Sequence, residues 1–414
     1  MNTEVLKMKA IMYGAGNIGR GFIAERFYLS GYETVFIDVN TQMVDAINEA
    51  REYPIYVTMG TEYVPTWIKN VRAVNGRDEA AAIAEIADAD IMATALGANI
   101  LPFVAPLIAK AIAARNKAGG VPLNILICEN LIGSDTYLRD LVAPHIADED
   151  KEYFENSIGF VSVVVGRTVP PTPKEFSDKY PAAVCADVYS ELPANPVGFR
   201  PVGCELPPVK GLVTFSPFAY YIERKLLIHN MGHAMTAYLS VLKNYSYVHD
   251  GTDDAEIKYF VMRALIESAR ALAKRHGAPC DDCVRFAEEL VPRFENRLLM
   301  DALDRVGRDP KRKVGAGDRL GGAFKMVKET GATPAYIGIG IAAAYLYRNE
   351  ADATSVELTD YVKANGLAAA LAKYSDITDE KDAAMIETFY NMLARRAPFK
   401  EFLPVLADIL RTEH

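Results

Sequence analysis

Cysteine is scarce in this sequence, and this scarcity excludes a small protein stapled by disulfides. The 414 residues include five cysteines, which are Cys128, Cys185, Cys204, Cys280 and Cys283. An odd and sparse set in a long chain is typical of reduced thiols in the cytoplasm. Cys280 and Cys283 form a C-x-x-C pair, but no second pair with zinc-ligand spacing accompanies it. We therefore predict structural thiols near a helix start and no metal site.

Long apolar segments are also missing. The most apolar run, residues 337–346, is too short and too rich in alanine and glycine to span a bilayer. The first nine residues carry charged side chains and contain no apolar core of signal-peptide length. These features predict a soluble, cytoplasmic protein with no membrane partner.

Positive charge is outweighed by negative charge. The chain has 45 Lys and Arg residues against 54 Asp and Glu residues, which gives a formal net charge of −9. This balance argues against a nucleic-acid partner, although a local basic site remains possible. Half of the residues are hydrophobic, which is enough for two cores in a chain of this length. We expect a monomer or a small homo-oligomer.

A glycine-rich turn follows the first apolar run. Residues 10–13 predict a strand, residues 20–29 a helix and residues 34–37 a second strand. The G-x-G-x-x-G turn between the first strand and the helix contributes the candidate cofactor-binding residues Gly14, Gly16, Asn17, Ile18 and Gly19. Such glycines permit a tight turn, a close approach of the pyrophosphate and helix–strand packing. A glycine-rich turn of another α/β protein is the alternative, but the order of elements favours a dinucleotide site.

An acidic residue closes the second strand of this unit. Asp38 lies about 20 residues beyond the glycine turn, where a carboxylate can hydrogen-bond both hydroxyls of a ribose. It would repel a 2′-phosphate, and Val39 and Asn40 supply no compensating cation. The sequence therefore favours NAD over NADP.

Two later strands end in candidate site residues. Residues 89–95 predict a strand that runs into Gly97, and residues 123–127 predict one that runs into Asn130. In a doubly wound sheet, ligands bind at the carboxyl ends of the strands. We therefore expect Gly97 and Asn130 near the nicotinamide and the substrate, although an asparagine here can also be a simple turn former.

The organisation changes in the middle of the chain. Residues 158–165 and 183–189 predict strands that extend the sheet, and a proline-rich segment follows them. Helical periodicity then dominates, with apolar faces near residues 254–276, 282–291, 333–348, 354–364 and 381–396. We predict an α/β Rossmann domain with a doubly wound, mostly parallel sheet at residues 1–212, followed by a mostly α-helical domain at residues 213–414.

One stretch of the second half carries an unusual set of polar side chains. Residues 220–233 predict one helix, in which Lys225, Asn230 and His233 fall within an arc of roughly 140°. A cation, an amide and an imidazole on one face suit a site that removes a proton from an alcohol and stabilises its oxygen. The alternative is an ordinary solvated face of the helix.

A basic cluster follows later in the chain. Within nine positions it contains Arg305, Arg308, Lys311, Arg312 and Lys313. A solvated charged turn would explain it on composition alone. The functional interpretation is a clamp for an anionic or polyhydroxylated substrate, because guanidinium groups bind phosphate in a bidentate manner.

Together these stretches resemble the polyol-specific long-chain dehydrogenase family over nearly the whole chain. The resemblance rests on residues 14–23, 128–130, 223–233, 293–296, 305–308 and 318–320. The family pattern K-x4-N-x2-H is met by Lys225, Asn230 and His233. One departure is Gly166, which stands where the family commonly has Asp before Arg167.

The resemblance implies a Rossmann domain and a mostly helical domain with the site between them and no metal. It implies that Lys225 is the general acid/base and that Asn130 and Asn230 hydrogen-bond the reacting oxygen. It further implies substrate-binding roles for His233, Arg305, Arg308 and Lys313. Within the family, the pattern is most similar to enzymes that interconvert D-mannitol 1-phosphate and D-fructose 6-phosphate with NAD. Its partner would thus be a small polyol phosphate or ketose phosphate.

Other activities remain open. Mannitol 2-dehydrogenase, fructuronate reductase and tagaturonate reductase share the chemistry, and uronates are also anions. A short-chain dehydrogenase is suggested by the spacing of Tyr221 and Lys225, but the chain is much longer than that class. A noncatalytic NAD-sensing protein would bind NADH and turn over no polyol. The presence of Lys225 together with two asparagines argues against that last class.

Overall fold

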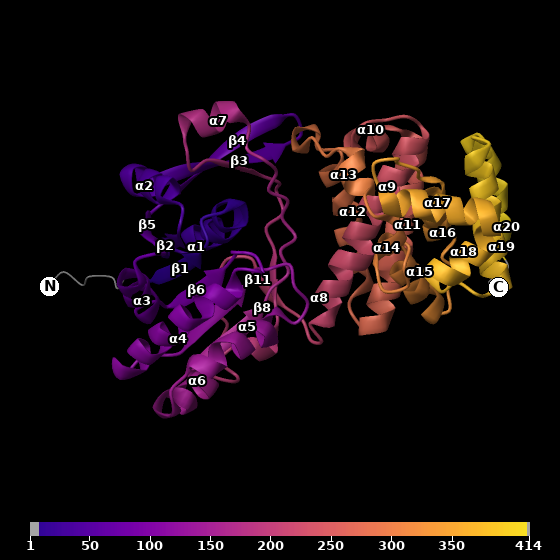
Figure 1. Cartoon of the computed structure of the whole chain (residues 1–414). Coiled ribbons are helices and arrows are strands. Elements are labelled where there is room, and N and C mark those ends of the chain that lie inside the picture. The colour runs from indigo at the N-terminus through magenta and orange to yellow at the C-terminus, as the bar shows by residue number, and fades with distance from the viewer. Residues whose placement is uncertain (1–7, 412–414) are drawn as a thin grey trace. The chain divides into compact units, whose positions relative to one another are not determined.

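The computed structural model describes residues 8–411, and the chain forms two compact units that divide between Phe218 and Ala219. The first unit is built on a six-stranded sheet (Figure 1). Its strands are β1 (Lys9–Tyr13), β2 (Glu33–Asp38), β5 (Val71–Asn75), β6 (Ile91–Thr94), β7 (Leu123–Ile127) and β8 (Ile158–Ser162). All neighbouring strands are parallel, and their order is β5-β2-β1-β6-β7-β8. This is the strand order of a Rossmann fold, which confirms the predicted fold of the first half.

Apolar side chains cover both faces of this sheet, as a parallel sheet requires. One face packs against α3 (Glu79–Ala87), α4 (Leu101–Lys117) and α5 (Ser134–Val142). The other face packs against η1 (Gly19–Ile23), α1 (Ala24–Leu29) and α2 (Thr41–Ala50). The short α6 (Lys151–Ser157) leads into β8. The carboxyl ends of the strands are thereby left for ligands.

A second, smaller sheet lies outside the predictions made from the sequence. The strands β3 (Glu52–Met59) and β4 (Glu62–Lys69) form an antiparallel hairpin, and β9 (Val184–Ala186) pairs with β3 in parallel. Of the two strands predicted to extend the main sheet, only β8 joins it, because β9 pairs with this hairpin instead. After α7 (Lys174–Lys179), β10 (Leu192–Ala194) and β11 (Leu212–Thr214) form a separate parallel pair.

The second unit is helical, as predicted. Its helices are α8 (Ala219–Glu223), η5 (Arg224–His229), α9 (Asn230–Leu242), α10 (Val248–Asp253), α11 (Ala255–His276), α12 (Cys280–Phe294), η6 (Arg297–Leu299), α13 (Leu303–Gly307), α14 (Pro310–Lys313), α15 (Arg319–Glu329), α16 (Ala335–Leu346), α17 (Ala353–Asn365), α18 (Leu367–Ala370), η7 (Leu371–Ser375), α19 (Glu380–Ala394) and α20 (Phe399–Arg411). The five segments with predicted apolar faces correspond to α11, α12, α16, α17 and α19.

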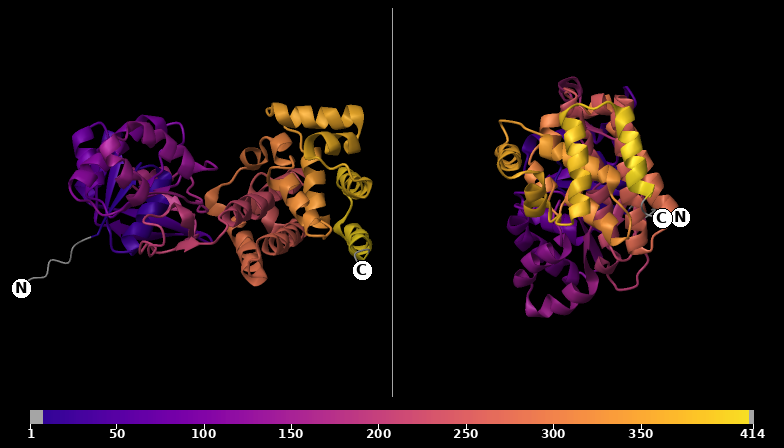
Figure 2. Two further views of the ribbon diagram at one scale, coloured as in Figure 1. Left: turned by 90° about the horizontal axis from the view of Figure 1, so that it is seen from below. Right: turned by 90° about the vertical axis from the view of Figure 1, so that its right-hand side faces the viewer.

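The most apolar run of the sequence forms the centre of this unit. The helix α16 is buried on nearly all sides and packs against α9, α11, α15 and α19. The last helix, α20, is the yellow helix that ends beside the C label in Figure 2, and it packs against α16 and α19. Across residues 8–411, every helix is either too short or too polar to cross a bilayer.

Candidate active site

The glycine turn of the first unit has a backbone that only glycine can supply. Gly14 has a φ of +105°, and a Cβ there would lie 2.6 Å from the carbonyl oxygen of Ala95. A Cβ on Gly19 would overlap the carbonyl oxygen of Gly14. A Cβ on Gly16, in contrast, would meet no protein atom within 4 Å. Gly16 therefore leaves an open backbone surface, as close approach of a pyrophosphate requires.

The helix after this turn begins with a π-helical turn, η1, where the sequence had predicted a plain α-helix. Arg20 in this turn is buried, and its guanidinium donates to the carbonyls of Ala15 and Ala182 at 2.7 Å each. The guanidinium thus joins the glycine turn to the segment before β9. Asn17 and Ile18 precede η1 and complete the predicted cofactor-binding turn.

Asp38 lies at the carboxyl end of β2, next to the glycine turn. One carboxylate oxygen accepts from the N–H of Ala15 at 2.6 Å, and the other accepts from the N–H of Asn40 at 2.9 Å. Each oxygen has a further lone pair and can still accept from a hydroxyl. Asp38 therefore fixes the shape of the turn and presents a carboxylate at the edge where the ribose of a dinucleotide would bind.

Gly97 and Asn130 follow two neighbouring strands, β6 and β7, whose ends pair at Thr94 and Ile127. Between them the structure places Glu129, a carboxylate for which the sequence pattern had indicated no specific role. Its side chain is 5% exposed and accepts from the Thr94 hydroxyl at 2.7 Å and the Leu96 N–H at 2.9 Å. Glu129 thereby joins the two strand ends and holds the exposed residues Gly97 and Asn130 at one edge of the sheet.

In the second unit, the predicted single helix contains a π-helical turn. The helices α8 and α9 are continuous through η5, and the N–H of Asn230 donates to the carbonyl of Lys225, five residues earlier. Residues five apart therefore stand one turn above each other, instead of about 140° apart as in an α-helix. The hydroxyl of Ser268 donates to the carbonyl of Leu227 in this turn at 2.7 Å. The π-turn thus aligns Lys225 with Asn230.

Lys225 has the environment that a general acid/base lysine needs. Its side chain is half-buried, and within residues 8–411 its ammonium has no hydrogen-bond or ion-pair partner. Burial, and then the charge of Arg319, lowers its pKa from the ordinary 10.5. A lysine of this kind can lose and regain a proton closer to neutral pH.

His233 is oriented by two residues from other elements. Its Nε2 lies 2.7 Å from a carboxylate oxygen of Asp301, and its ring stacks on Phe294 with a centroid distance of 5.2 Å. Burial raises the pKa of Asp301, but hydrogen bonds and charges from His233 and Arg305 outweigh this and bring it below its ordinary value. The carboxylate therefore holds one imidazole nitrogen, and the other is available to a substrate.

The basic cluster is divided by the structure into residues of different environments. Arg305 is 64% exposed and pairs with Asp301, Lys311 pairs with Glu357, and Arg312 pairs with Asp309 and Asp318. Arg308 is exposed. The cluster is therefore not one clamp, because carboxylates of the protein already bind three of its cations.

Lys313 is the member of the cluster that is buried. Its side chain is 4% exposed, and its ammonium donates to the carbonyl of Val306 and lies 5.9 Å from the ring centroid of Tyr238. Burial, followed by the charges of Arg319 and Arg312, lowers its pKa to about 7. Arg319, at the start of α15, thus influences both Lys225 and Lys313.

The departure at Gly166 has a structural reason. A Cβ at this position would lie 2.5 Å from Cε1 of Tyr189, so the tyrosine ring occupies the space of a side chain. The hydroxyl of Tyr189 donates to the carboxylate of Glu191 at 3.1 Å. An aspartate at 166 would therefore require the tyrosine to move.

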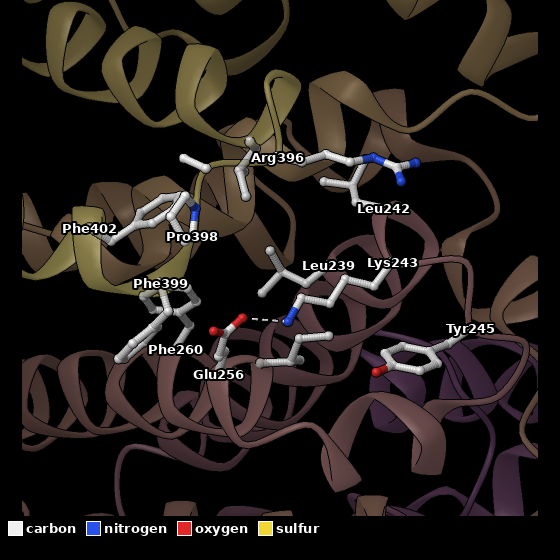
Figure 3. Close-up of a pocket in the computed structure, with 13 residues that line it drawn as sticks. Leu239, Leu242, Lys243, Tyr245, Glu256, Phe260, Arg396, Pro398, Phe399 and Phe402 are labelled. Carbon is white, nitrogen blue, oxygen red and sulfur yellow. Dashed lines mark hydrogen bonds and ion pairs between the residues drawn. The ribbon is translucent and has the colours of Figure 1, made fainter.

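A cavity of about 390 Å³ lies elsewhere in the helical unit (Figure 3). Its walls are largely apolar and include Leu239, Phe260 and Phe402. The ammonium of Lys243 at its edge pairs with Glu256, as the dashed line in Figure 3 marks. The cavity contains none of the predicted site residues.

Within the described part of the chain, no group of three or more His, Cys, Asp or Glu side chains could hold a metal ion.

Two solved structures have a similar fold. A D-sorbitol dehydrogenase in substrate-free form has a TM-score of 0.78 at 16% sequence identity, over 94% of this chain and 94% of that chain. The mannitol 2-dehydrogenase of Pseudomonas fluorescens, in a ternary complex with NAD and D-mannitol, has a TM-score of 0.63 at 17% identity. That match covers 97% of this chain and 94% of the other. The fold is thus shared over nearly the full length.

Two family profiles match the sequence itself. The mannitol dehydrogenase Rossmann domain matches residues 8–200, and the mannitol dehydrogenase C-terminal domain matches residues 218–397. The two matches together span well over half of the chain and confirm the predicted polyol dehydrogenase family. The chain belongs to the mannitol dehydrogenase family.

Proposed function

We propose that the protein catalyses the reversible NAD-dependent oxidation of D-mannitol 1-phosphate to D-fructose 6-phosphate, the activity of a mannitol-1-phosphate 5-dehydrogenase. Membership of the mannitol dehydrogenase family supports polyol oxidation as the class of reaction. Two observations support the phosphorylated substrate. Within residues 8–411 the ammonium of Lys225 has no carboxylate partner, and the ammonium of Lys313 is buried and donates to a backbone carbonyl.

NAD is the cofactor that the first unit favours. The carboxylate of Asp38 would accept from the ribose hydroxyls and would repel the extra phosphate of NADP. Arg20 interacts electrostatically with Asp38, but its guanidinium already donates to the carbonyls of Ala15 and Ala182. It is therefore not available to that phosphate. The related mannitol 2-dehydrogenase structure contains NAD, which supports the same dinucleotide here.

Lys225 is assigned the proton transfer. When bound, NAD supplies a nicotinamide ring that accepts the hydride from the alcohol carbon. The hydroxyl proton passes to the neutral amine of Lys225 during oxidation and returns from the ammonium during reduction. The lowered pKa of Lys225 makes the neutral amine easier to reach than in an ordinary lysine.

The asparagines are assigned to the reacting oxygen. Asn230 follows Lys225 by one turn of the π-helix, and in this proposal its side-chain amide donates to an oxygen that gains negative charge. Asn130 is assigned the same role from the first unit, on the strength of its exposed position after β7. His233, held by Asp301, would bind a further hydroxyl of the polyol.

The direct test compares ketone substrates at equal concentration. We would measure NADH oxidation with D-fructose 6-phosphate, D-fructose, D-fructuronate and D-tagaturonate. Turnover confined to fructose 6-phosphate is the expected result. Turnover of another ketose would keep the mechanism but refute the sugar phosphate. Tight NADH binding without turnover of any would refute the proposal in favour of a noncatalytic NAD-binding protein.

A further inference from the structure

We propose that Arg319 binds the phosphate group of the substrate through its two terminal nitrogens, with Lys313 beside it. This inference rests on the proposed function and names the residue that would distinguish a phosphorylated substrate from a neutral polyol. The sequence did not single out Arg319 as a site residue, because it lies outside the basic cluster. The structure singles it out by its contacts.

Arg319 is the first residue of α15, and Asp318 is the N-cap of that helix. The Nε of Arg319 donates to one oxygen of Asp318 at 2.8 Å, which fixes the plane of the guanidinium. Within residues 8–411, its two terminal nitrogens have no hydrogen-bond or ion-pair partner. The side chain is 18% exposed, so these donors are neither satisfied by protein nor fully in solvent. A guanidinium whose plane is fixed and whose two terminal nitrogens are unbound is suited to bidentate binding of an oxyanion.

Two glycines bring Arg319 close to the catalytic turn. A Cβ on Gly321 would overlap the carbonyl oxygens of Val314 and Gly315, which directly follow Lys313. A Cβ on Gly322 would lie 3.0 Å from a methyl group of Leu227 in η5. The start of α15 is therefore packed against both the π-turn that carries Lys225 and the segment that carries Lys313.

The charges near Arg319 are mostly positive. The positive charge of Arg319 lowers the pKa of both Lys225 and Lys313. Burial first, then the charge of Arg293, and after it those of His233, Lys225 and Arg319, hold the pKa of His229 well below its ordinary value, so His229 adds no charge. Tyr238 is also within reach, and burial raises its pKa, so it remains neutral.

Among the described residues, Asp309 and Asp318 are the carboxylates that act on Lys313, and both are shared with other cations. Asp318 binds Arg312 as well as Arg319, and Asp309 binds Arg312. Lys225, Lys313 and Arg319 together thus exceed the negative charge around them. An excess of poorly solvated cations is unfavourable in the free protein and is relieved by an anion. A phosphate monoester carries up to two negative charges and several acceptor oxygens, and so it fits this site better than a neutral hydroxyl or a uronate.

The test uses a matched pair of variants. Arg319→Gln and Arg312→Gln each remove one guanidinium that contacts Asp318. Two of the three nitrogens of Arg312 are already bound by Asp309 and Asp318, whereas within residues 8–411 only the Nε of Arg319 is bound. We expect Arg319→Gln to lower kcat/KM for fructose 6-phosphate by about 10- to 100-fold, the loss of one or two charge-assisted hydrogen bonds. Its kcat/KM for D-fructose should change much less. Arg312→Gln should retain the ratio of the kcat/KM values for fructose 6-phosphate and D-fructose.

Three further measurements separate binding from a structural defect. Inorganic phosphate should bind the wild type and Arg312→Gln in calorimetric titration and bind Arg319→Gln at least tenfold more weakly, which requires no turnover. The pH at which ketone reduction falls should also rise in Arg319→Gln, because loss of that cation raises the pKa of Lys225. NADH affinity should be unchanged.

The outcomes also distinguish this inference from the proposed function. If the wild type prefers another ketose, the proposed function fails, whereas the phosphate titration still tests Arg319. If the wild type prefers fructose 6-phosphate and Arg319→Gln keeps that preference and the phosphate affinity, the inference is overturned while the function stands. Equal losses in Arg319→Gln and Arg312→Gln would also overturn it.

Discussion

Lys313 should destabilise the free protein, and Lys313→Met should therefore stabilise the helical unit. Its ammonium is buried, and among the residues that the structure describes it donates to the carbonyl of Val306 alone. Its pKa of about 7 lies well below the 10.5 of an unfolded chain. The unfolded protein therefore binds a proton at this residue more tightly than the folded protein does. The wild type should gain stability as the pH rises from 7 to 10.5, and the gain should be absent in the variant.

The magnitude follows from the size of the pKa difference. At about 1.4 kcal/mol per pKa unit, the buried ammonium of Lys313 lowers the free energy of unfolding by about 5 kcal/mol below pH 7. This loss shrinks by about 2 kcal/mol between pH 7 and pH 9. Methionine leaves the carbonyl of Val306 without its donor, which costs about 1–3 kcal/mol. We therefore expect Lys313→Met to be more stable by about 2–3 kcal/mol at pH 7 and nearly equal to the wild type at pH 9.

Urea unfolding monitored by far-UV circular dichroism is the assay, since most helices belong to the second unit. The only tryptophan, Trp67, lies in β4 and reports on the first unit by fluorescence, which shows whether both units unfold in one transition. A variant that is no more stable at pH 7, or a difference that does not change with pH, would refute the reasoning. The same variant should bind fructose 6-phosphate more weakly.

Substitutions at three further positions test other parts of the account. Asp38→Ala should weaken NADH binding and reduce the ratio of NADH affinity to NADPH affinity. Asp38→Asn should reduce the same ratio while retaining an oxygen that accepts from the N–H of Ala15. An unchanged ratio of NADH to NADPH affinities in both variants would contradict the ribose role. Asp301→Asn should raise KM for the ketose by about tenfold, because a charge-assisted hydrogen bond to His233 is lost, with a smaller change in kcat; an unaltered KM would show that His233 needs no such partner. Tyr221→Phe should leave turnover close to that of the wild type, and a large loss would revive the Tyr-x3-Lys mechanism of the short-chain enzymes.

The first half of the fold was predictable because local pattern and tertiary role coincide there. A short apolar strand, the glycine turn and the acid at the end of β2 are each set by neighbouring residues, and the structure places them as expected. The hairpin of β3 and β4 was not predicted, since it interrupts the alternation of strands and helices. The partner of β9 could not be read from a segment of three paired residues.

The helical half shows a different limit. The pattern K-x4-N-x2-H was evident, but its geometry was calculated for an α-helix, in which Lys225 and Asn230 do not align. The π-turn aligns them, and the carbonyl of Leu227 in this turn accepts from Ser268, which is distant in sequence. The pairing of His233 with Asp301 and the packing of α15 against η5 are also tertiary contacts. Sequence spacing gave the chemical groups of this half but not how they are arranged.

The central claim is that Lys225 moves the proton as a polyol phosphate is oxidised. The most direct measurement is NADH formation from NAD and D-mannitol 1-phosphate, as a function of pH, by the wild type and Lys225→Ala. We expect the rate of the wild type to rise with pH through an apparent pKa below 10.5, because the base must be neutral. Lys225→Ala should lose turnover by several orders of magnitude and still bind NADH. Failure of the wild type to oxidise D-mannitol 1-phosphate, or persistent turnover in Lys225→Ala, would contradict the account.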